Sequence, residues 1–486
     1  MGSTVQVRPY AALRQAKQTV RTARPTLTAA VLLVADLAAV LAAGSAAVWL
    51  WSFLKPAVDP SEYLRLWPAA LAYLAAYGMF GLYPGPGIGP VEELRRMALA
   101  TTLVSLASTA ALVLTREAGF SRGVLLGAWI LTLFAVPLSR AAARSLLAAC
   151  WWWGAPVVVL GAGKAGRAVV QRLKQQPELG LKPAAFFDDD AEKPPACEGV
   201  PLAGPLKTAP EWGRQHKVHY ALIAIPSLKR PELLTVLEDC GASFRHVILL
   251  PDLFGMASLW VNACDLGGLL GLEVRQNLLS PLNRALKRLL DVCISLPAAM
   301  LALPVIALAA LWIRRVSPGN PFYTQQRGGE AGKTIRVYKL RTMYPNADQI
   351  LSRYLAERPE AWLEWQRTCK LKNDPRLLPG IGKLLRRTSL DELPQLWNIL
   401  KGEMSLVGPR PFPSYHLERF PSDFQTLRAR VRPGLTGLWQ VTARSDGDLE
   451  IQQALDAYYI RNWSIWLDLH ILARTLRAVL SARGAY

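Results

Sequence analysis

The 486-residue chain contains few of the residues that usually hold metals or form disulfides. Its five histidines form no metal-ligand cluster, and its six cysteines are scattered without a Cys-x-x-Cys pair. This spacing indicates neither a zinc site nor a disulfide framework, and it fits a reducing, cytosolic setting. Catalysis by a histidine or cysteine constellation is not indicated either. The length predicts two to four domains.

Acidic residues are also scarce. There are 36 of them against 56 lysines and arginines, which gives a formal charge of +20. A basic balance favours nucleic acid, anionic lipid or phosphorylated substrates as partners. A hydrophobic fraction of 51% and a mean hydropathy of +0.18 argue against a nucleic-acid-binding protein and for a membrane protein. No nucleic-acid partner is therefore expected.

The first 150 residues contain four apolar stretches, each long enough to cross about 30 Å of hydrocarbon as a helix. The first is too long for a cleaved signal peptide, and further spans follow it. Basic residues precede the first stretch and follow the second and fourth, so this predicted four-helix transmembrane domain begins and ends in the cytoplasm. Asp36 is expected to make a structural polar contact inside the bundle, because a carboxylate is costly in lipid. The stretches are residues 27–54, 66–83, 97–115 and 123–139.

Residues 151–280 have the pattern of a Rossmann-like cytosolic domain. A buried strand at 157–160 precedes Gly161-x-Gly163-x-x-Gly166 and a helix at 167–176, and a second strand at 184–187 ends at Asp188. Further strands are expected at 221–225 and 246–250, with a helix at 231–240 between them. Gly161, Gly163, Gly166 and Asp188 form a possible nucleotide site.

Three interpretations of this middle domain remain open: a fold that binds nothing, a regulatory nucleotide site, and a catalytic NAD site. The first two are favoured. A membrane-bound, NAD-dependent sugar-nucleotide dehydratase would need a Tyr-x-x-x-Lys pair, and no tyrosine in this chain has a lysine four residues later. That activity is therefore an unlikely alternative.

The third predicted domain, residues 281–486, begins with an apolar segment that is long enough to be a fifth span. Basic residues flank both of its ends, Pro304 lies in its middle, and a crossing would export everything that follows. These features favour a re-entrant helix–break–helix at about 284–315. The remainder is predicted to be mainly α-helical, with helices at 359–369 and 454–480. Trp362, Trp365, Trp463 and Trp466 are placed either on amphipathic helices at the headgroup level or in the core.

An adjacent acid pair, Asp391-Glu392, follows Arg386 in this domain. Ser389-x-x-Glu392 fits a helix capping box, which would place both acids in a first helical turn, where free N–H groups attract anions. A well-capped helix without further function is the alternative. Four short segments add basic residues on a backbone fixed by proline and glycine, and such guanidinium groups suit phosphate recognition. These segments are 338–343 with Lys339 and Arg341, 372–376 with Asp374 and Arg376, 407–411 with Arg410, and 431–440 with Arg432.

Together these residues predict phosphoryl transfer, which depends on positioning and charge neutralisation. A carboxylate can act as the nucleophile and form an acyl phosphate, so Asp391 would attack the sugar-linked phosphate of a nucleotide sugar. Glu392 would hold Mg²⁺, which prefers carboxylate and phosphate oxygens. Neighbouring residues on a helix point about 100° apart, which suits two different tasks.

Residues 388–395, 407–411 and 431–440 resemble the bacterial sugar transferase family of monotopic phosphoglycosyl transferases. These enzymes move a sugar 1-phosphate from a nucleoside diphosphate sugar to undecaprenyl phosphate. The resemblance is dense from about 284 to 480, and the two preceding domains match the large members of the family. Residues 251–255 and 266–277 resemble the undecaprenyl-phosphate galactose phosphotransferase branch, which implies UDP-galactose. UDP-glucose and other UDP-sugars remain open.

The resemblance implies a role for each matched residue. Asp391 becomes the phosphosugar-bearing nucleophile, Glu392 and Asp391 hold Mg²⁺, and Arg386 contacts phosphate. The start of the re-entrant helix matches Lys287, Arg288 and Asp291, and its break matches Pro304, although Leu303 stands where the family often has serine. The remaining residues expected to bind substrate or phosphate are Lys339, Arg341, Asp374, Arg376, Arg410 and Arg432.

The resemblance also implies a setting. The expected partners are a UDP-sugar, undecaprenyl phosphate, membrane lipid and a second copy of the chain in a homodimer. The location is a bacterial inner membrane, which the chain crosses several times, with the catalytic domain on the cytoplasmic face. The reaction would be the first membrane step of O-antigen, capsule or exopolysaccharide synthesis.

Overall fold

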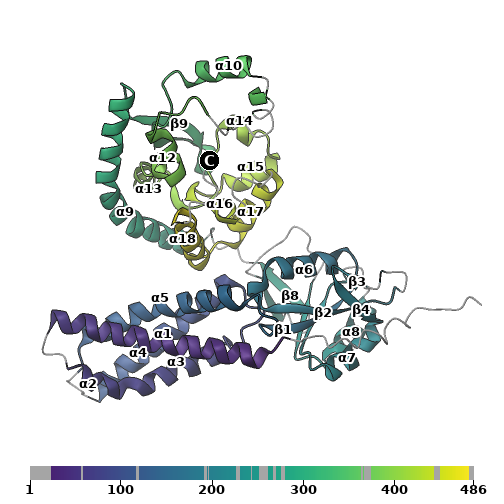
Figure 1. The fold of residues 1–486 in the computed structure, drawn as a ribbon. Coiled ribbons are helices and arrows are strands. Elements are labelled where there is room, and N and C mark those ends of the chain that lie inside the picture. The colour runs from purple at the N-terminus through teal and green to yellow at the C-terminus, as the bar shows by residue number, and fades with distance from the viewer. Residues whose placement is uncertain are drawn as a thin grey trace, which may run out of the picture. The chain divides into compact units, whose positions relative to one another are not determined.

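The computed structural model describes residues 23–480, apart from 56–58, 116–119, 191–193, 195, 226–229, 242, 251–260, 266–269, 275–277, 279, 359, 363–364, 366–370, 372–373 and 443–448. The chain forms two compact units, residues 1–255 and 256–486. The first unit contains an apolar helical bundle and a sheet, and the second contains the Asp391 region. The two units are shown in Figure 1.

The helical bundle of the first unit consists of α1 (Pro25–Leu54), α3 (Trp67–Met79), α4 (Pro90–Leu114) and α5 (Arg122–Leu147). Among the helices that the structure describes, α1, α4, α5 and the later α9 are long and apolar enough to cross a membrane. The second expected span, 66–83, is corrected. Its α-helix has 13 residues and ends at Met79, before the expected end at residue 83. It continues directly from α2 (Pro60–Tyr63) and a 3₁₀ turn (Leu64–Leu66).

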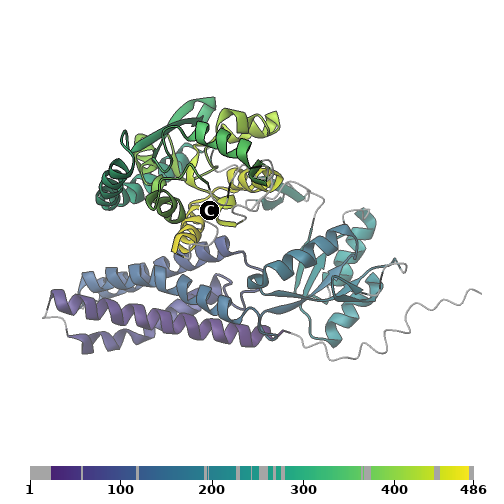
Figure 2. The same cartoon turned by 45° about the horizontal axis from the view of Figure 1, so that its top comes forward.

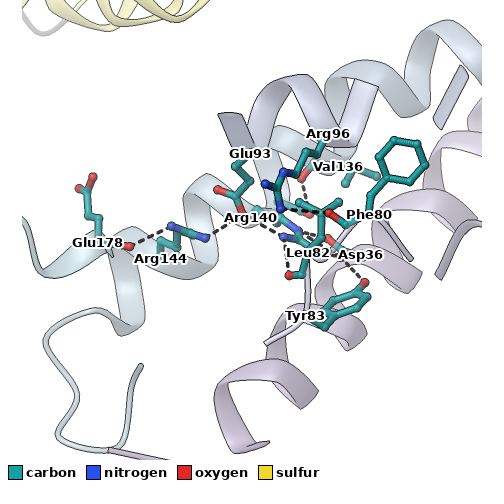
Figure 3. A network of polar contacts seen from close by, with 11 residues as sticks. Asp36, Phe80, Leu82, Tyr83, Glu93, Arg96, Val136, Arg140, Arg144 and Glu178 are labelled. Atoms are coloured by element: carbon teal, nitrogen blue, oxygen red, sulfur yellow. Dashed lines mark hydrogen bonds and ion pairs between the residues drawn. The ribbon is translucent and has the colours of Figure 1, made fainter. Parts of the chain in front are cut away.

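A network of buried charges joins three helices of the bundle (Figure 3). Asp36 on α1 is fully buried, as expected, and its carboxylate lies 2.6 Å from Nη2 of Arg140 on α5. Nη1 of Arg140 lies 2.8 Å from Oε1 of Glu93 on α4, and Nη2 of Arg144 lies 2.7 Å from the same oxygen. Two carboxylates and two guanidinium groups therefore neutralise each other, which compensates the cost of removing them from water.

The bundle is hydrogen-bonded to the sheet that follows it. Nη1 of Arg144 donates to the carbonyl oxygen of Glu178 at 2.9 Å, and the N–H of Gly154 donates to Oγ1 of Thr28 at 2.8 Å. Glu178, the partner of Arg144 in Figure 3, lies in a 3₁₀ turn just before β2, and Gly154 lies immediately before β1. The buried charge network thus extends from the membrane helices to the edge of the α/β domain.

The sheet of the first unit has six strands in the order β3-β4-β2-β1-β5-β6. All neighbours are parallel except β3 and β4, and helices cover both faces (Figures 1 and 2). Residues of β1 alternate between two cores, with Val157 and Val159 in one and Val158 and Leu160 in the other. This two-sided burial explains the continuous apolar run in the sequence. The elements are β1 (Ala155–Leu160), α6 (Lys164–Gln175), β2 (Leu181–Phe187), β3 (Ala196–Cys197), β4 (Val200–Gly204), α7 (Ala209–Gln215), β5 (Tyr220–Ile223), α8 (Arg230–Gly241) and β6 (His246–Leu249).

In its described residues the second unit is mainly helical, with three two-stranded sheets. The sheets pair β7 (Val261–Asp265) with β8 (Leu270–Val274), β9 (Phe322–Gly328) with β10 (Thr334–Leu340), and β11 (Ser405–Val407) with β12 (Gly434–Thr436). Its helices are α9 (Pro281–Val316), α10 (Ala347–Glu357), α12 (Ile381–Thr388), α13 (Gln395–Lys401), α14 (Ser414–Leu417), α15 (Ser422–Arg428), α16 (Leu438–Thr442), α17 (Leu449–Asn462) and α18 (Ile465–Leu480).

Two expectations for the tryptophan-rich segments change. The predicted helix 454–480 is divided into α17 and α18, and Trp463 between them is buried, with its indole N–H donating to Asp468 at 3.0 Å. Trp463 is therefore a core residue and does not lie at the membrane surface. Most of the helix expected at 359–369 lies outside the described residues, but Trp362 is 47% exposed.

Helix α9 passes through Pro297 and Pro304 without interruption, so the expected break is corrected to a bend within one helix (Figure 1). A straight helix of 36 residues would be about 54 Å long. In the bent helix, Lys287 near one end and Ile313 near the other both pack against the same domain. Between them, Leu301 and Leu308 are more than two-thirds exposed. The middle of α9 thus presents an apolar surface while both ends are anchored.

Candidate active site

The acid pair lies on a turn between two helices. Helix α12 ends at Thr388 because Ser389 adopts a left-handed conformation, with φ 57°. Leu390–Glu392 then form one 3₁₀ turn, and α13 starts after Pro394. The expected capping box is therefore wrong. Ser389 makes no side-chain cap, and its carbonyl oxygen instead accepts the N–H of Glu392 at 3.2 Å. The two acids nevertheless lie together at a turn.

Three basic residues surround the carboxylate of Glu392. Nζ of Lys339 on β10 lies 2.6 Å from Oε1, and Nη2 of Arg410 lies 3.5 Å from the same atom. Arg327 on β9 adds a third nearby positive charge. Burial alone would raise the pKa of Glu392, but Arg410, Lys339 and Arg327 outweigh it and hold this pKa below its usual range. Glu392 is therefore ionised at neutral pH.

Asp391 has the opposite shift. Burial raises the pKa of Asp391 to about 6, and the negative charge of Glu392 adds to the effect, while Lys339 and Arg386 oppose it. Two neighbouring carboxyl groups with pKa values shifted in opposite directions are typical of sites that give them different tasks. Asp391 is deprotonated at neutral pH but is a stronger base than an ordinary aspartate, which favours nucleophilic attack.

Arg386, on the last turn of α12, adds a positive charge that acts on Asp391. Its Nε donates to Oγ1 of Thr342 at 3.1 Å, and its charge interacts with Asp391 and Asp374. Asp374 itself pairs with Arg376 through two hydrogen bonds of 2.8 and 2.6 Å. The charge of Arg386 thus acts on Asp391, whereas the charge of Arg376 is neutralised by Asp374.

The segments around Arg410 and Arg432 form one structural unit. The N–H of Gly408 donates to Thr436 and the N–H of Gly434 donates to Pro409, each at 2.9 Å. A Cβ atom on Gly434 would lie 2.1 Å from the nitrogen of Gly408, so only glycine permits this approach. Gly408 and Gly434 therefore allow the backbone segments around Arg410 and Arg432 to approach each other closely.

Arg432 and Arg341 pair with other groups than Glu392, the partner of Lys339 and Arg410. Nε of Arg432 lies 3.1 Å from Oε2 of Glu330, and Arg432 lines a cavity of about 690 Å³ with Arg284 and Lys333. Nη2 of Arg341 donates to the carbonyl of Ser317 at 2.5 Å, at the C-terminus of α9. These contacts give Arg341 a structural role at the end of α9.

The residues expected at the start of the re-entrant helix anchor α9 to the catalytic domain. Nζ of buried Lys287 lies 2.7 Å from Oδ2 of Asp468 and donates to the carbonyl of Val407 at 3.0 Å. Asp291 accepts from the hydroxyl of Ser405 and the N–H of Leu406, both at 3.0 Å. Arg288 donates to the carbonyls of Ile399 and Leu400 at the end of α13. The N-terminal part of α9 is thus fastened to α13 and β11, which flank the acid pair and Arg410.

Comparison with known proteins identifies the family of this chain. The model of the family described as bacterial sugar transferase matches residues 282–482. The chain is 35% identical, over 76% of its length and 77% of the relative's, to the undecaprenyl-phosphate galactose phosphotransferase of Salmonella typhimurium. The chain belongs to the bacterial sugar transferase family. It is a transferase and a membrane protein.

Two further relatives cover much of the chain. The UDP-galactose-lipid carrier transferase of Erwinia amylovora is 34% identical over 82% of both chains. The UDP-glucose:undecaprenyl-phosphate glucose-1-phosphate transferase of Escherichia coli is 31% identical over 68% of both. A second family model, described as a CoA-binding domain, matches residues 79–251. The relatives therefore include proteins named for galactose and for glucose.

The glycine-rich turn of the α/β domain has a clear structural role in this sugar transferase. Gly161 has φ +100°, and a Cβ on Gly166 would lie 1.9 Å from the oxygen of Gly161, whereas a Cβ on Gly163 would meet open space. Oδ2 of Asp188 accepts the N–H of Ala162 at 2.7 Å. Two of the three glycines and the acid therefore shape the turn itself, and nucleotide binding by this domain stays a prediction.

Several residues of the site could not be found from sequence motifs. Arg327 lies on β9 outside every motif, paired with Ile335 of β10, and its positive charge acts on Glu392. Asn398 on α13 is fully buried, and it donates to the carbonyl of Arg336 and accepts the N–H of Tyr338. Asn398 thus fixes α13 against the strand that carries Lys339, a role that its sequence position alone does not reveal.

The family resemblance implies Mg²⁺. Within the described part of the chain, no group of three or more histidine, cysteine, aspartate or glutamate residues could hold a metal ion. Mg²⁺ is commonly bound by one or two carboxylates together with substrate phosphates and water. The adjacent carboxylates of Asp391 and Glu392 fit that donor set, and the remaining ligands would come from the substrate.

Proposed function

We propose that this sugar transferase moves galactose 1-phosphate from UDP-galactose to undecaprenyl phosphate, which yields undecaprenyl-diphosphate-galactose and UMP. The supporting observation is the opposite shift of the pKa values of Asp391 and Glu392 among Lys339, Arg386 and Arg410. The names of the relatives from Salmonella and Erwinia support the substrates.

The reaction proceeds in two displacements at one phosphorus atom. A carboxylate oxygen of Asp391 attacks the sugar-linked phosphate of UDP-galactose, and the bond to the bridging oxygen breaks, so UMP leaves with that electron pair. An oxygen of undecaprenyl phosphate then attacks the same phosphorus and releases Asp391 as a carboxylate. Each step forms one phosphorus–oxygen bond and breaks another, so no further reactant is needed.

The surrounding residues hold the diphosphate and stabilise its charge. Lys339 and Arg410 lie beside Glu392, and the charge of Arg386 acts on Asp391. Fixed positive groups in a partly buried site stabilise the charge that develops on the transferred phosphoryl group. Asp391 and Glu392 would hold Mg²⁺, which supplies further charge neutralisation when it is bound.

We assign the catalytic domain to the cytoplasmic face of a bacterial inner membrane. The bend of α9 brings both of its ends to one domain, so both ends lie on the same side of the bilayer. The exposed apolar middle of α9 then enters the hydrocarbon and returns. This arrangement holds Asp391 where a soluble nucleotide sugar and a lipid phosphate can both reach it.

The decisive experiment uses the full chain in lipid nanodiscs with Mg²⁺, undecaprenyl phosphate and a panel of UDP-sugars, read by UMP release. UDP-galactose is expected to give the highest kcat/KM, and a higher value with UDP-glucose would assign the enzyme to that sugar instead. With UDP-galactose labelled in the sugar, the protein should carry label after acid quenching when the lipid is omitted. Asp391→Asn should lose both the label and turnover, and near-wild-type UMP release by this variant would reject the mechanism.

A further inference from the structure

The backbone around Arg410 is held at four successive carbonyl groups. We call residues 409–412, Pro-Arg-Pro-Phe, the arginine loop. Its prolines fix φ at two positions and provide no N–H groups, so the loop cannot secure itself through those donors. Other parts of the domain supply donors to every carbonyl of the loop. In chain order these donors are the N–H of Gly434, Nη2 of Arg428, Nη1 of Arg327 and the N–H of Gly328.

The donor to the carbonyl of Arg410 is unusual because it is a buried charged side chain. Arg428 is only 8% exposed, and its guanidinium carbon lies 4.5 Å from the ring centre of Phe412. Phe420 and Phe424 complete the aromatic surroundings, each with its ring centre 5.9 Å away. Such a position removes most of the water from the guanidinium group, which is costly without a counter-charge.

Asp456 on α17 provides that counter-charge. Its Oδ2 lies 3.6 Å from Nε of Arg428, and Asp456 is only 2% exposed. Burying an ion pair adds little to stability on average, because a well-packed apolar pair often does as well. The pair therefore calls for a reason other than stability, and Arg428 donates to the carbonyl of the residue that faces Glu392.

We propose that Arg428, held in place by Asp456, is a positioning residue that fixes Arg410 for phosphoryl transfer. The inference rests on the proposed function, since Arg410 acts on the diphosphate. Arg428 itself does not contact Glu392 through its side chain; it acts through the arginine loop. Misplacing a catalytic group by about 1 Å can lower a rate about 100-fold. Loss of Arg428 should therefore lower kcat much more than it raises KM.

The test is a double-mutant cycle in the full chain, in nanodiscs, with UMP release as the readout. Arg428→Met should lower kcat about 10- to 100-fold and change KM less than about threefold. In an Arg410→Ala background the same substitution should have almost no further effect, because the group that it positions is already absent. An equal effect of Arg428→Met in both backgrounds would overturn the proposal.

Two variants separate positioning from simple destabilisation. Ile471→Ala removes a fully buried side chain of α18 and should lower Tm without lowering kcat at a temperature where the variant is folded. Arg428→Lys keeps the charge and one donor and should restore part of the lost kcat. If Arg428→Met does not fold, Arg428→Lys and Asp456→Asn are each combined with Arg410→Ala in the same double-mutant cycle. Additive effects of the two substitutions on kcat would then reject the proposal.

Failure of the proposed function gives a different result. In that case the wild-type protein would release UMP from none of the UDP-sugars, with or without the lipid. If the wild-type protein is active and the cycle is additive, the sugar transferase assignment stands and only the role of Arg428 is rejected.

Discussion

The Nζ atom of Lys339 lies 2.6 Å from Oε1 of Glu392, and this contact joins strand β10 to the turn that carries Asp391. The same lysine opposes the rise in the pKa of Asp391. One side chain on a strand therefore influences both carboxylates of the turn: it keeps Glu392 ionised and limits the basicity of Asp391.

Replacing this lysine should affect both rate and pH dependence. Lys339→Met is expected to lower kcat/KM about 10²- to 10³-fold, as loss of an electrostatic donor commonly does. Because removal of a nearby cation raises a carboxyl pKa, the acidic limb of the pH–rate profile should move to higher pH. The exposed lysine of α12 provides the control, Lys383→Met, whose profile should match that of the wild type. An unshifted limb in Lys339→Met would contradict the assigned electrostatics.

The wild-type enzyme should lose activity in mild acid. The pKa of Asp391 is raised to about 6, and in the proposed mechanism the carboxylate is the form that attacks. Below pH 6 the carboxylate fraction falls about tenfold per pH unit, so kcat/KM should fall with the same slope. Above pH 7 Asp391 is almost fully ionised, so its titration should no longer change kcat/KM. Thermal melts at each pH provide the control for unfolding, and a constant kcat/KM down to pH 5 would show that Asp391 has an ordinary pKa.

Two glycines of the turn after β1, Gly163 and Gly166, should differ sharply in how well they tolerate substitution by alanine. Gly166→Ala would place a Cβ 1.9 Å from the oxygen of Gly161, so it should lower Tm and the yield of folded protein. Gly163→Ala adds a Cβ in open space and should be tolerated, with a Tm close to that of the wild type. Equal effects of the two substitutions would show that the backbone does not follow the described turn.

The buried charge network of the bundle should be sensitive to removal of a single partner. Arg140→Met leaves the carboxylates of Asp36 and Glu93 with too little positive charge, and breaking a buried pair in this way costs about 3–5 kcal/mol. A large fall in Tm in detergent is the expected result. Arg95→Gln breaks a half-exposed pair with Glu92, where about 0–1 kcal/mol is expected. Comparable losses in the two variants would show that the network is not buried in the membrane-embedded protein.

Cysteine labelling tests the path of α9. In a background without the native cysteines, Leu282→Cys and Arg315→Cys stand near the two ends of the helix and should both react with an impermeant maleimide only from the cytoplasmic side. A third variant, Leu301→Cys, should be protected because it lies in hydrocarbon. Labelling of position 315 from the periplasmic side would mean that α9 crosses the membrane.

Elements with a strong hydrophobic period could be predicted from the sequence. The buried strand after Pro156, helices α6 and α8 and the long apolar helices lie close to where the pattern placed them, whereas α7 was not predicted. The second span was placed less well, because an apolar run does not reveal that the segment begins at Pro60 with a short helix and a 3₁₀ turn. The break at Pro304 was wrong because proline can be accommodated within a bent helix.

The site could be predicted only as a set of motifs. Ser389 matches a capping box by residue type, yet its left-handed backbone is set by the tertiary turn between α12 and α13. Arg327 and Arg428 lie outside the motifs and reach the site through strand pairing and a buried ion pair. Arg341 lies inside a motif yet holds the end of α9. Sequence spacing indicates which residue types are near each other along the chain, but folding over 50 to 100 residues decides which atoms meet.

The anchoring of α9 also imposes an order on biosynthesis. Lys287 and its partner Asp468 are 181 residues apart in the chain, and a ribosome adding about 5–20 residues per second needs roughly 10–35 s to span them. Throughout that interval Lys287 lacks the carboxylate that neutralises it. This anchor of α9 therefore forms only after α18 has been made, around a helix that is already in place. A protein truncated before Asp468 would present to the quality-control proteases of the membrane a helix with an unneutralised lysine at its base.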